Sequence, residues 1–332
     1  MFNKKYWTVS PTNRVIGQAA DRAAAKEPEA IIFDIQSFSI QDGPGIRTTV
    51  FMKGCPLRCI WCHNPESISG RPQLMINPAL CVACGACVKA CPNQAQQILA
   101  AGHQVNWERC NSLGLCVQVC AYNALNLVGQ KYTPAKLWQR LAADWHYWEL
   151  QAGGETGGVS FSGGEPMLQT TFIKHFVAQA PKPVHVAVQT SGYAPTSRFN
   201  ELIDSVDLWL FDYKASGQQA HREMTGQDNS LILANLDHLC QLGQNIVLRL
   251  PIIPGLNDSD LHFQTIAELL HTYPQIRRAE IIGYHNLGES KQLRLGQPPA
   301  CYQHPSASPD QKLAWLNRLA SLGVTNAVLA NG

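Results

Sequence analysis

The sequence lacks long hydrophobic runs, a marked excess of either charge and any apolar segment near its start. Its apolar stretches are short and interrupted by Gly, Pro or charged residues, so we expect no transmembrane helix. With 26 basic and 24 acidic residues the net charge is +2, which gives no support for a nucleic-acid or membrane partner. Residues 1–30 carry charges but no apolar core, so we expect a solvated tail rather than a secretory signal.

Length and apolar content are sufficient for a large folded core. The 332 residues allow one large domain or two modest ones, and 45% of them are hydrophobic, which excludes global disorder. Segments typical of strands alternate with segments typical of helices. The expected strands cover 48–52, 159–162, 184–188, 206–213, 245–251 and 279–283, and the expected helices cover 169–180, 231–242, 259–273 and 310–322. This alternation predicts an α/β fold with a parallel sheet, either a partial barrel or a doubly wound sheet.

Polar residues and glycines lie at the ends of most of these expected strands. In parallel α/β folds the functional site lies at the carboxyl ends of the strands, so we expect these residues to converge. The set comprises Cys55, Gly163 to Glu165, Gln189, Thr190, Asp212, Lys214, Arg249 and His285. Because loops are polar in any protein, each single residue has an ordinary explanation, whereas the set as a whole favours a site.

Cysteine is abundant and unevenly distributed. Ten of the 12 cysteines lie between Cys55 and Cys120. A disulfide framework suits small secreted domains, and scattered buried cysteines would show no regular spacing. The regular spacing therefore favours ligation of a metal or cluster. For Cys240 and Cys301, which lie outside this region, we expect ordinary burial in apolar surroundings.

The first group, Cys55, Cys59 and Cys62, has the spacing Cys-x3-Cys-x2-Cys. A structural zinc site needs four ligands, and no fourth cysteine or suitably spaced histidine completes this one, although His63 is adjacent. Three thiolates can instead hold a [4Fe–4S] cluster and leave one iron open to another molecule. The spacing resembles the signature of enzymes that bind S-adenosylmethionine (SAM) at such an open iron.

The second block of cysteines repeats itself. Its first half matches the bacterial ferredoxin run, whose fourth cysteine ligates the other cluster of a pair, and its second half has Leu113 where the pattern has cysteine. Swapped ligation gives a complete set, Cys81, Cys84, Cys87 and Cys120, and an incomplete set, Cys91, Cys110 and Cys116. The incomplete set could hold a [3Fe–4S] cluster, a [4Fe–4S] cluster with an external or unidentified ligand, or nothing. A zinc ribbon is the alternative for the whole block.

The surroundings of the first group carry a more specific resemblance. The motifs are Asp42-Gly-Pro-Gly-Ile-Arg47, Phe51, Gly54, Asn64-Pro-Glu-Ser67, Ser162-Gly-Gly-Glu-Pro166, Asp212-Tyr-Lys214 and Gly283-Tyr-His-Asn-Leu-Gly288. Through most of residues 31–290 they resemble the glycyl radical enzyme activating family of radical SAM enzymes. One position departs from the family pattern: Gln189 stands before Thr190 where relatives usually have Asp or Glu. Glutamine keeps the hydrogen bonding but loses the charge.

The resemblance implies a fold and a reaction. The fold is a partial (β/α)6 barrel of the TIM type, formed by residues 31–71 and 131–332, with a ferredoxin-type [4Fe–4S] insert at residues 72–130. A reduced cluster cleaves SAM, and the resulting radical takes a hydrogen atom from a glycine Cα of a partner glycyl radical enzyme, which makes the protein an oxidoreductase. No side-chain acid or base is assigned. The implied setting is the cytoplasm of an anaerobic or facultative organism, with a flavodoxin- or ferredoxin-type electron donor.

The resemblance also assigns residues. Asp42 and Arg47 would contact the glycine loop of the partner, and the insert would deliver electrons, store them or serve structure alone. The residues expected around SAM are Trp61, His63, Gly163, Gly164, Glu165, Gln189, Thr190, Asp212, Lys214, Arg249 and His285. Two rival interpretations remain. A radical SAM enzyme acting on a small molecule or another peptide would not need the motif at residues 42–47. An electron-transfer protein would leave the resemblance at Gly164, Lys214 and His285 unexplained.

Overall fold

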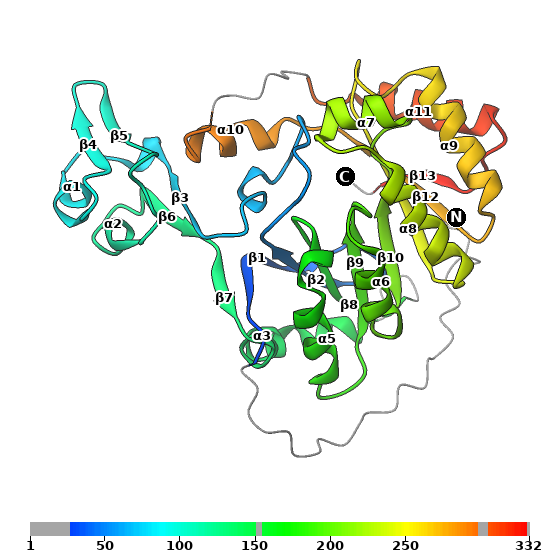
Figure 1. Cartoon of the computed structure of the whole chain (residues 1–332), viewed down its shortest axis with the longest axis horizontal. Coiled ribbons are helices and arrows are strands. Elements are labelled where there is room, and N and C mark those ends of the chain that lie inside the picture. The colour runs from blue at the N-terminus through cyan, green and yellow to red at the C-terminus, as the bar shows by residue number, and fades with distance from the viewer. Residues whose placement is uncertain (1–26, 151–154, 298–304, 331–332) are drawn as a thin grey trace.

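The computed structural model describes residues 27–150, 155–297 and 305–330. Figure 1 shows a β-sheet with helices packed around it and a small cysteine-rich part that projects from it. The expected tail at residues 1–30 lies outside the described residues except for its last four, and Ala30 already belongs to the first strand. Among the described residues, no helix has the length and apolar character needed to cross a membrane.

Within the described residues the main sheet has nine strands, in the order β13-β12-β11-β10-β9-β8-β2-β1-β7. They are β1 (Ala30–Ser39), β2 (Arg47–Met52), β7 (Gln130–Tyr132), β8 (Gly158–Gly163), β9 (His185–Thr190), β10 (Leu208–Asp212), β11 (Ile246–Ile252), β12 (Arg278–Gly283) and β13 (Ala327–Leu329). Neighbours from β2 to β13 are parallel, whereas β1 is antiparallel to both β2 and β7.

The parallel α/β character predicted from the sequence is confirmed. The expected strands are present as β2 and as β8 to β12, and the parallel strands follow one another in chain order. A doubly wound sheet would reverse that order at a switch point, so the order favours the partial barrel. The additional strands β7 and β13 have three residues each, too few to show an alternating pattern.

Helices connect the parallel strands. The expected helices are present as α5 (Thr170–Ala178), α8 (Ser230–Gln241), α9 (Asp260–Thr272) and α11 (Pro309–Ser321). Side-chain caps fix two of their starts: Ser259 accepts from the backbone of His262 at α9, and Ser308 forms a capping box with Gln311 at α11. Shorter helices, beyond those expected, are α3 (Pro134–Leu141), α4 (Trp145–Trp148), α6 (Thr196–Leu202), α7 (Gln218–Thr225) and α10 (Leu287–Arg294).

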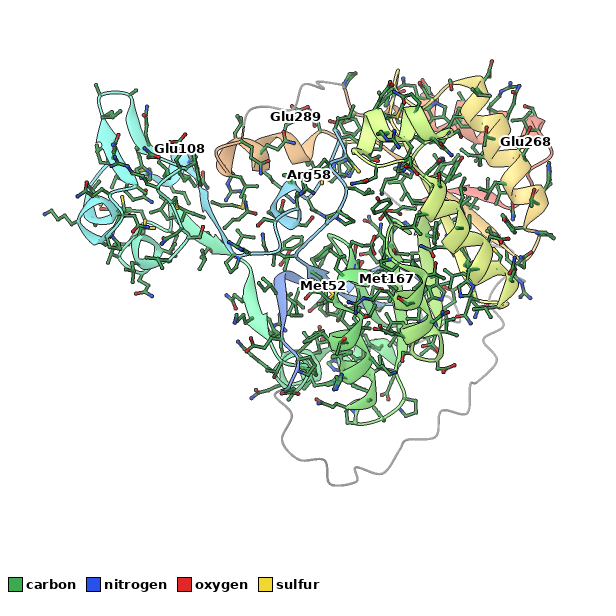
Figure 2. All side chains as sticks on the ribbon, in the orientation of Figure 1. Met52, Arg58, Glu108, Met167, Glu268 and Glu289 are labelled. Atoms are coloured by element: carbon green, nitrogen blue, oxygen red, sulfur yellow. The ribbon has the colours of Figure 1, made fainter. Side chains whose placement is uncertain are left out.

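The main core lies between the sheet and these helices. Phe161 of β8 meets Phe176 of α5 edge-on, with ring centroids 5.2 Å apart, and Phe176 stacks on Trp138 of α3 at 4.1 Å. The indole of Trp138 also donates to the carbonyl of Phe176 over 2.7 Å, which fixes α3 to α5. Met52 and Met167 lie fully buried in the same core, labelled in Figure 2. This packing supports the strand ends from which the loops of the site emerge.

The cysteine-rich insert has a core of its own. It consists of β3 (Gln73–Ile76) paired with β6 (Leu125–Val128), β4 (Gln96–Leu99) paired with β5 (Gly102–Val105), α1 (Ala86–Ala90) and α2 (Leu115–Gln118). Leu74, Ile76 and Leu125 pack with Cys87 and Cys116 in a cluster separate from the main core. Figure 1 shows the insert at the left, beyond α10. The boundaries at residues 72 and 130 stay a prediction.

Candidate active site

The loop of residues 55–62 begins just after β2, at the carboxyl end of the parallel sheet. Its backbone is fixed on two sides. The amide of Cys55 donates to the carbonyl of Ile68 over 3.1 Å, and the amide of Arg58 donates to the carbonyl of Thr225 over 2.7 Å. The loop is therefore held between the turn that follows it and the end of α7.

All three thiols of this loop have raised pKa values. Burial raises the pKa of Cys55 and of Cys62 to about 12 and also raises the pKa of Cys59, and neighbouring thiols add to the first two shifts. Without a metal the thiols are neutral, and iron ligation has to displace their protons. No three His, Cys, Asp or Glu side chains among the described residues are close enough to hold a single metal ion. In an iron–sulfur cluster, by contrast, each cysteine binds a different iron atom.

The two glycines after β8 let this strand end pack against the backbone that leads into Cys55. A Cβ on Gly164 would lie 2.2 Å from the carbonyl oxygen of Gly54, and Gly163 has φ +103°. The amide of Gly164 donates to Met52 over 2.8 Å, and the amide of Glu165 donates to Gly54 over 2.7 Å. In the structure the close approach that glycine permits is to the backbone of the cysteine loop.

Glu165 is fully buried and joins the loop after β8 to the loop after β9. Its carboxylate accepts from the hydroxyl of Thr190 at 2.7 Å and from both the backbone amide and the hydroxyl of Ser191, at 2.9 and 2.6 Å. It also accepts from the amide of Met167 at 3.1 Å. Burial raises the pKa of Glu165, although these hydrogen bonds oppose the shift. The structure thus gives Glu165 and Thr190 a role inside the scaffold of the site.

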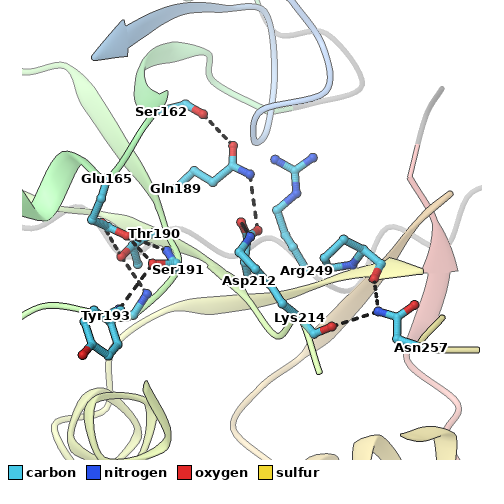
Figure 3. Close-up of polar contacts among 12 residues, drawn as sticks. Ser162, Glu165, Gln189, Thr190, Ser191, Tyr193, Asp212, Lys214, Arg249 and Asn257 are labelled. Carbon is cyan, nitrogen blue, oxygen red and sulfur yellow. Dashed lines mark hydrogen bonds and ion pairs between the residues drawn. The ribbon is translucent and has the colours of Figure 1, made fainter. Parts of the chain in front are cut away.

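A chain of polar side chains crosses the carboxyl ends of three parallel strands (Figure 3). The hydroxyl of Ser162 donates to Gln189 over 2.8 Å, and the amide nitrogen of Gln189 donates to Asp212 over 3.3 Å. Asp212 then pairs with Lys214 at 2.7 Å. At position 189 an acid would repel Asp212, whereas the glutamine amide supports it. The departure from the family pattern is therefore matched by the local hydrogen bonding.

Lys214 is a largely buried cation next to the cysteine loop, with a side chain that is 14% exposed. Burial alone would lower its pKa, but the neighbouring carboxylate of Asp212 opposes burial, and the pKa lies above its ordinary value. The carbonyl of Lys214 accepts from Asn257 over 2.8 Å, which fixes the loop after β10. The site therefore presents a charged pair beside the three thiols.

A second group of paired charges centres on Arg249, which is buried on β11. Arg249 reaches Asp42 at 3.3 Å and Glu280 of β12 at 3.7 Å. Asp42 also accepts from the hydroxyls of Ser39 at 2.9 Å and Thr49 at 2.7 Å, so the segment before β2 is held in place. The residue expected near the partner loop is thus joined to one expected near SAM.

Arg47 is completely buried at the start of β2, at the opposite end of the strand from the cysteine loop. Its guanidinium donates to Ser160 at 2.6 Å, to the carbonyl of Val159 at 2.7 Å and to the carbonyl of Pro44 at 3.1 Å. Burial lowers its pKa to about 10, which leaves it protonated at neutral pH. Arg47 therefore joins β2 to β8. Its contact with a partner loop stays a prediction, and the complete burial of its side chain argues against such a contact.

His63 and His285 stack on each other with ring centroids 3.8 Å apart. Burial lowers the pKa of His63 to about 3, so this ring is neutral. Among the described residues, Nε2 of His63 and Nδ1 of His285 have no hydrogen-bond partner. Trp61 is buried beside Ile253 and Tyr284. The segment after β12 therefore packs on the cysteine loop, and it brings the imidazole of His285 onto that of His63.

Helix α10 covers the same loop, which the sequence patterns do not indicate. Lys291 donates to Asn64 over 2.9 Å and pairs with Glu66 at 2.7 Å. A Cβ on Gly288 would lie 2.4 Å from the carbonyl oxygen of Cys62. The one signal in the sequence is that Asn64 and Glu66 stand directly after the third cysteine of the group.

Each set of insert cysteines lines a pocket. Cys81, Cys84, Cys87 and Cys120 line one. Cys91, Cys110 and Cys116 line another, together with Leu113. These groupings match the swapped arrangement expected from the sequence, and ligation itself stays a proposal. Cys240 is buried as expected, and Cys301 lies outside the described residues.

Gln96 and His103 connect these two pockets. The side chain of Gln96 is buried, and its amide nitrogen donates to Sγ of Cys116 over 3.6 Å. Its amide oxygen lies 2.7 Å from Nε2 of His103, which lies 3.7 Å from Sγ of Cys87. Because an amide oxygen only accepts, Nε2 of His103 carries the proton. A hydrogen-bonded chain thus runs from one cysteine set to the other.

Comparison with known proteins places the chain in a family. A family model described as a 4Fe-4S single cluster domain matches residues 41–233, more than half of the chain. The 4-hydroxyphenylacetate decarboxylase activating enzyme of Clostridioides difficile is 38% identical over 284 residues, which cover 83% of this chain and 88% of the relative. The chain belongs to the glycyl radical enzyme activating enzymes. The family expected from the sequence is thereby confirmed.

Other activating enzymes are similar over comparable lengths. The trans-4-hydroxy-L-proline dehydratase activating enzyme of Clostridioides difficile is 37% identical, covering 79% of this chain and 86% of the relative. The choline trimethylamine-lyase activating enzyme of Oleidesulfovibrio alaskensis is 35% identical, covering 81% and 88%. A solved domain of a pyruvate-formate lyase-activating enzyme from Bacteroides vulgatus covers 53% of this chain and 99% of its own, with 24% identity and a TM-score of 0.43.

Membership defines the activity. Activating enzymes are radical SAM oxidoreductases that use a [4Fe–4S] cluster and SAM to install a radical on a glycine of a partner glycyl radical enzyme. The interpretation as a pure electron-transfer protein is thereby rejected, and the partner of this activating enzyme is a glycyl radical enzyme.

Proposed function

We propose that Cys55, Cys59 and Cys62 hold the [4Fe–4S] cluster of this activating enzyme and that SAM binds at its open iron. The observation that carries the proposal is the placement of three half-buried cysteines at the carboxyl end of the parallel sheet, beside the Asp212–Lys214 pair. The chemistry supplied there, once cluster and SAM are bound, is one-electron cleavage of SAM and removal of a hydrogen atom from a glycine Cα of the partner.

The polar chain that ends at Lys214 is the proposed cradle for the methionyl end of SAM. Lys214 offers a cation to the carboxylate, and Asp212 offers an anion to the amino group, in charge-assisted hydrogen bonds. Gln189 supports Asp212 without adding charge. Gly163 and Gly164 keep the end of β8 close to the cluster loop.

The aromatic residues on the other side of the loop are the proposed neighbours of the adenosine. Trp61 would pack against the adenine ring, and the stacked pair of His63 and His285 would lie near the ribose, with ring nitrogens available for its hydroxyls. Arg249 would complete the polar wall on β11. Glu165 and Thr190 act by holding the loops of β8 and β9 together.

The insert is proposed to be a ferredoxin-type electron carrier on a partial (β/α)6 barrel. The set formed by Cys81, Cys84, Cys87 and Cys120 would hold a complete [4Fe–4S] cluster, and the set formed by Cys91, Cys110 and Cys116 would hold a second cluster. The pocket that each set lines supports this assignment. Electrons would enter from a flavodoxin- or ferredoxin-type donor and pass to the SAM cluster.

The partner is proposed to be a glycyl radical enzyme of the decarboxylase, dehydratase or C–N lyase type, because the similar activating enzymes serve partners with those activities. The glycine loop of the partner would enter beside Asp42, which lies against Arg249. A panel with one partner of each type, followed by the electron paramagnetic resonance (EPR) signal of the glycyl radical, tests this part. Activation of pyruvate formate-lyase alone would contradict it.

The cluster assignment is tested by EPR of the anaerobically reconstituted and reduced protein. Addition of SAM is expected to change the spectrum of the reduced cluster, because SAM becomes a ligand of the open iron. Cys59→Ala should lose this SAM-dependent change and keep the signals of the insert. A change that persists in Cys59→Ala would move the SAM site away from this loop.

A further inference from the structure

The two halves of the insert repeat the same backbone at an offset of 29 residues. Positive φ angles, which are uncommon outside glycine, recur in matched pairs. The pairs are Ala83 (55°) with Ser112 (57°), Gly85 (77°) with Gly114 (78°), and Gln94 (51°) with Asn123 (52°). The second half therefore has the same loop conformation as the half that carries a full ferredoxin run.

The hydrogen bonds repeat with the same offset. Val88 donates to the carbonyl of Gly85 over 3.1 Å, and Val117 donates to the carbonyl of Gly114 over 3.0 Å. The turn after the fourth cysteine repeats as well, with amide-to-carbonyl distances of 3.1 Å for Gln94 to Cys91 and 3.3 Å for Asn123 to Cys120. By this offset Leu113 occupies the place of Cys84.

Apart from Leu113, the pocket lined by Cys91, Cys110 and Cys116 has the features of a cluster-binding site. Two sulfurs in it accept hydrogen bonds: Cys116 from the side chain of Gln96 at 3.6 Å, and Cys91 from the amide of Ala95 at 3.3 Å. Such donors favour thiolates and cluster ligation. Leu113 lines the pocket and is 55% exposed, so solvent reaches this corner.

We propose that the second site holds a [4Fe–4S] cluster whose iron at Leu113 has no protein ligand and takes a solvent hydroxide or a small thiolate. The proposal rests on the proposed function of the insert. It gives the chain a second open iron, distinct from the one in the loop of residues 55–62. Leucine has no donor atom, and the shared backbone leaves the position of the missing ligand facing solvent.

An iron held only by sulfide and an exchangeable ligand is lost on mild oxidation. Ferricyanide takes one electron, and the balance is [4Fe–4S]²⁺ → [3Fe–4S]⁺ + Fe²⁺ + e⁻. The cluster held by four cysteines keeps all its irons under the same conditions. The [3Fe–4S]⁺ product has an unpaired spin, so EPR detects the open site directly.

The experiment uses the full chain with Cys55→Ala, Cys59→Ala and Cys62→Ala, which removes the signal of the SAM cluster. Three versions are reconstituted anaerobically: this background alone, with Leu113→Cys, and with Leu115→Cys. The third is a matched control, since it adds a cysteine to the same loop at a position that aligns with Ala86 and not with a ligand. Iron and sulfide are quantified, and EPR spectra are recorded after ferricyanide treatment with and without 2-mercaptoethanol.

The background and Leu115→Cys are expected to contain iron for two clusters and to give a [3Fe–4S] signal that 2-mercaptoethanol suppresses. Leu113→Cys is expected to contain the same iron and lose the signal. An equal signal in Leu113→Cys, or no signal from a background with two clusters, overturns the proposal. Iron for a single cluster in the background also overturns it but leaves the complete site intact. Absence of iron from all versions overturns the proposed insert clusters themselves.

Discussion

The cysteine loop of the core and the cysteine-rich insert differ in the segments that hold them and in the charges around their cysteines. The core loop is half-buried, is held in part by the end of α7, which is distant in sequence, and lies beside the charged side chains of Asp212 and Lys214. The insert forms its pockets from segments close in sequence around a small core of its own. Among the described residues, no Asp, Glu, Lys or Arg lines either of its cysteine pockets.

This contrast fits the roles that we propose for the two regions, SAM binding for the core loop and electron transfer for the insert. SAM carries an amino group, a carboxylate and a sulfonium, so its site needs buried charges positioned against them. An electron carrier needs only ligands and an environment that sets the potential, for which hydrogen bonds to sulfur suffice. The two regions meet at α10, whose Lys291 pairs with Glu66 behind the core loop and whose Arg294 donates to Ile76 of the insert over 3.2 Å.

The largest effect is expected from loss of a ligand in the core loop. Cys62→Ala removes one of three cluster ligands and should abolish formation of 5′-deoxyadenosine from SAM, measured by liquid chromatography. Cys240→Ala, at a buried thiol outside both cysteine regions, should retain it. Comparable product from Cys62→Ala would refute the assignment of this loop.

A smaller effect is expected from loss of the charge of Lys214. Lys214→Met removes a charge-assisted contact to SAM and should weaken SAM binding roughly 10- to 100-fold. Anaerobic equilibrium binding to the reconstituted protein measures the change. The control is Lys182→Met, which breaks a surface ion pair with Glu149 and should leave SAM affinity unaltered. Unchanged affinity in Lys214→Met would remove Lys214 from the SAM site.

A substitution at Glu165 tests whether this residue supports the loops or contacts SAM directly. Glu165→Gln leaves hydroxyl and amide donors of Thr190 and Ser191 without a full set of acceptors and should lower the free energy of unfolding by about 1–3 kcal/mol. Urea unfolding followed by fluorescence measures this. The folded variant should bind SAM with nearly wild-type affinity. The opposite pattern, normal stability with weak SAM binding, would place Glu165 in direct contact with SAM.

The smallest effect is expected in the insert. Gln96→Leu removes a hydrogen-bond donor to Cys116. Because that donor stabilises the more negative reduced cluster, its loss should lower the reduction potential of the second site without loss of iron. EPR-monitored redox titration measures the shift. Gln97→Leu, at the exposed neighbouring position, should leave the potential in place. Equal potentials in all three proteins would show that the Gln96–His103 chain does not tune the cluster.

The sequence contained enough to predict the parallel strands. These strands are continuous apolar runs bounded by polar residues, whereas the cysteine ligand sets stay a prediction. The strand β1 was not among the expected strands, although its residues alternate between buried and more exposed positions, as is typical of a strand. Where the signal lies within a few neighbouring residues, prediction succeeded.

Roles that depend on contacts between distant segments could not be predicted. Arg47 belongs to a motif that suggests partner binding, yet burial against β8 makes it part of the sheet. Glu165 follows two glycines that suggest a ligand, yet its carboxylate is used by the loop after β9. The contact of Lys291 with Glu66 joins residues more than 200 positions apart, and no local pattern reports it.

The most direct test of the division between core and insert is hydrogen transfer from glycine. Reconstituted protein, dithionite, SAM and a glycine-loop peptide with both Cα hydrogens replaced by deuterium are combined anaerobically, and 5′-deoxyadenosine is analysed by mass spectrometry. Because dithionite can reduce the core cluster directly, wild type and Cys81→Ala should both give deuterated product, and Cys59→Ala should give none. Deuterated product from Cys59→Ala, or its loss in Cys81→Ala alone, would contradict the account.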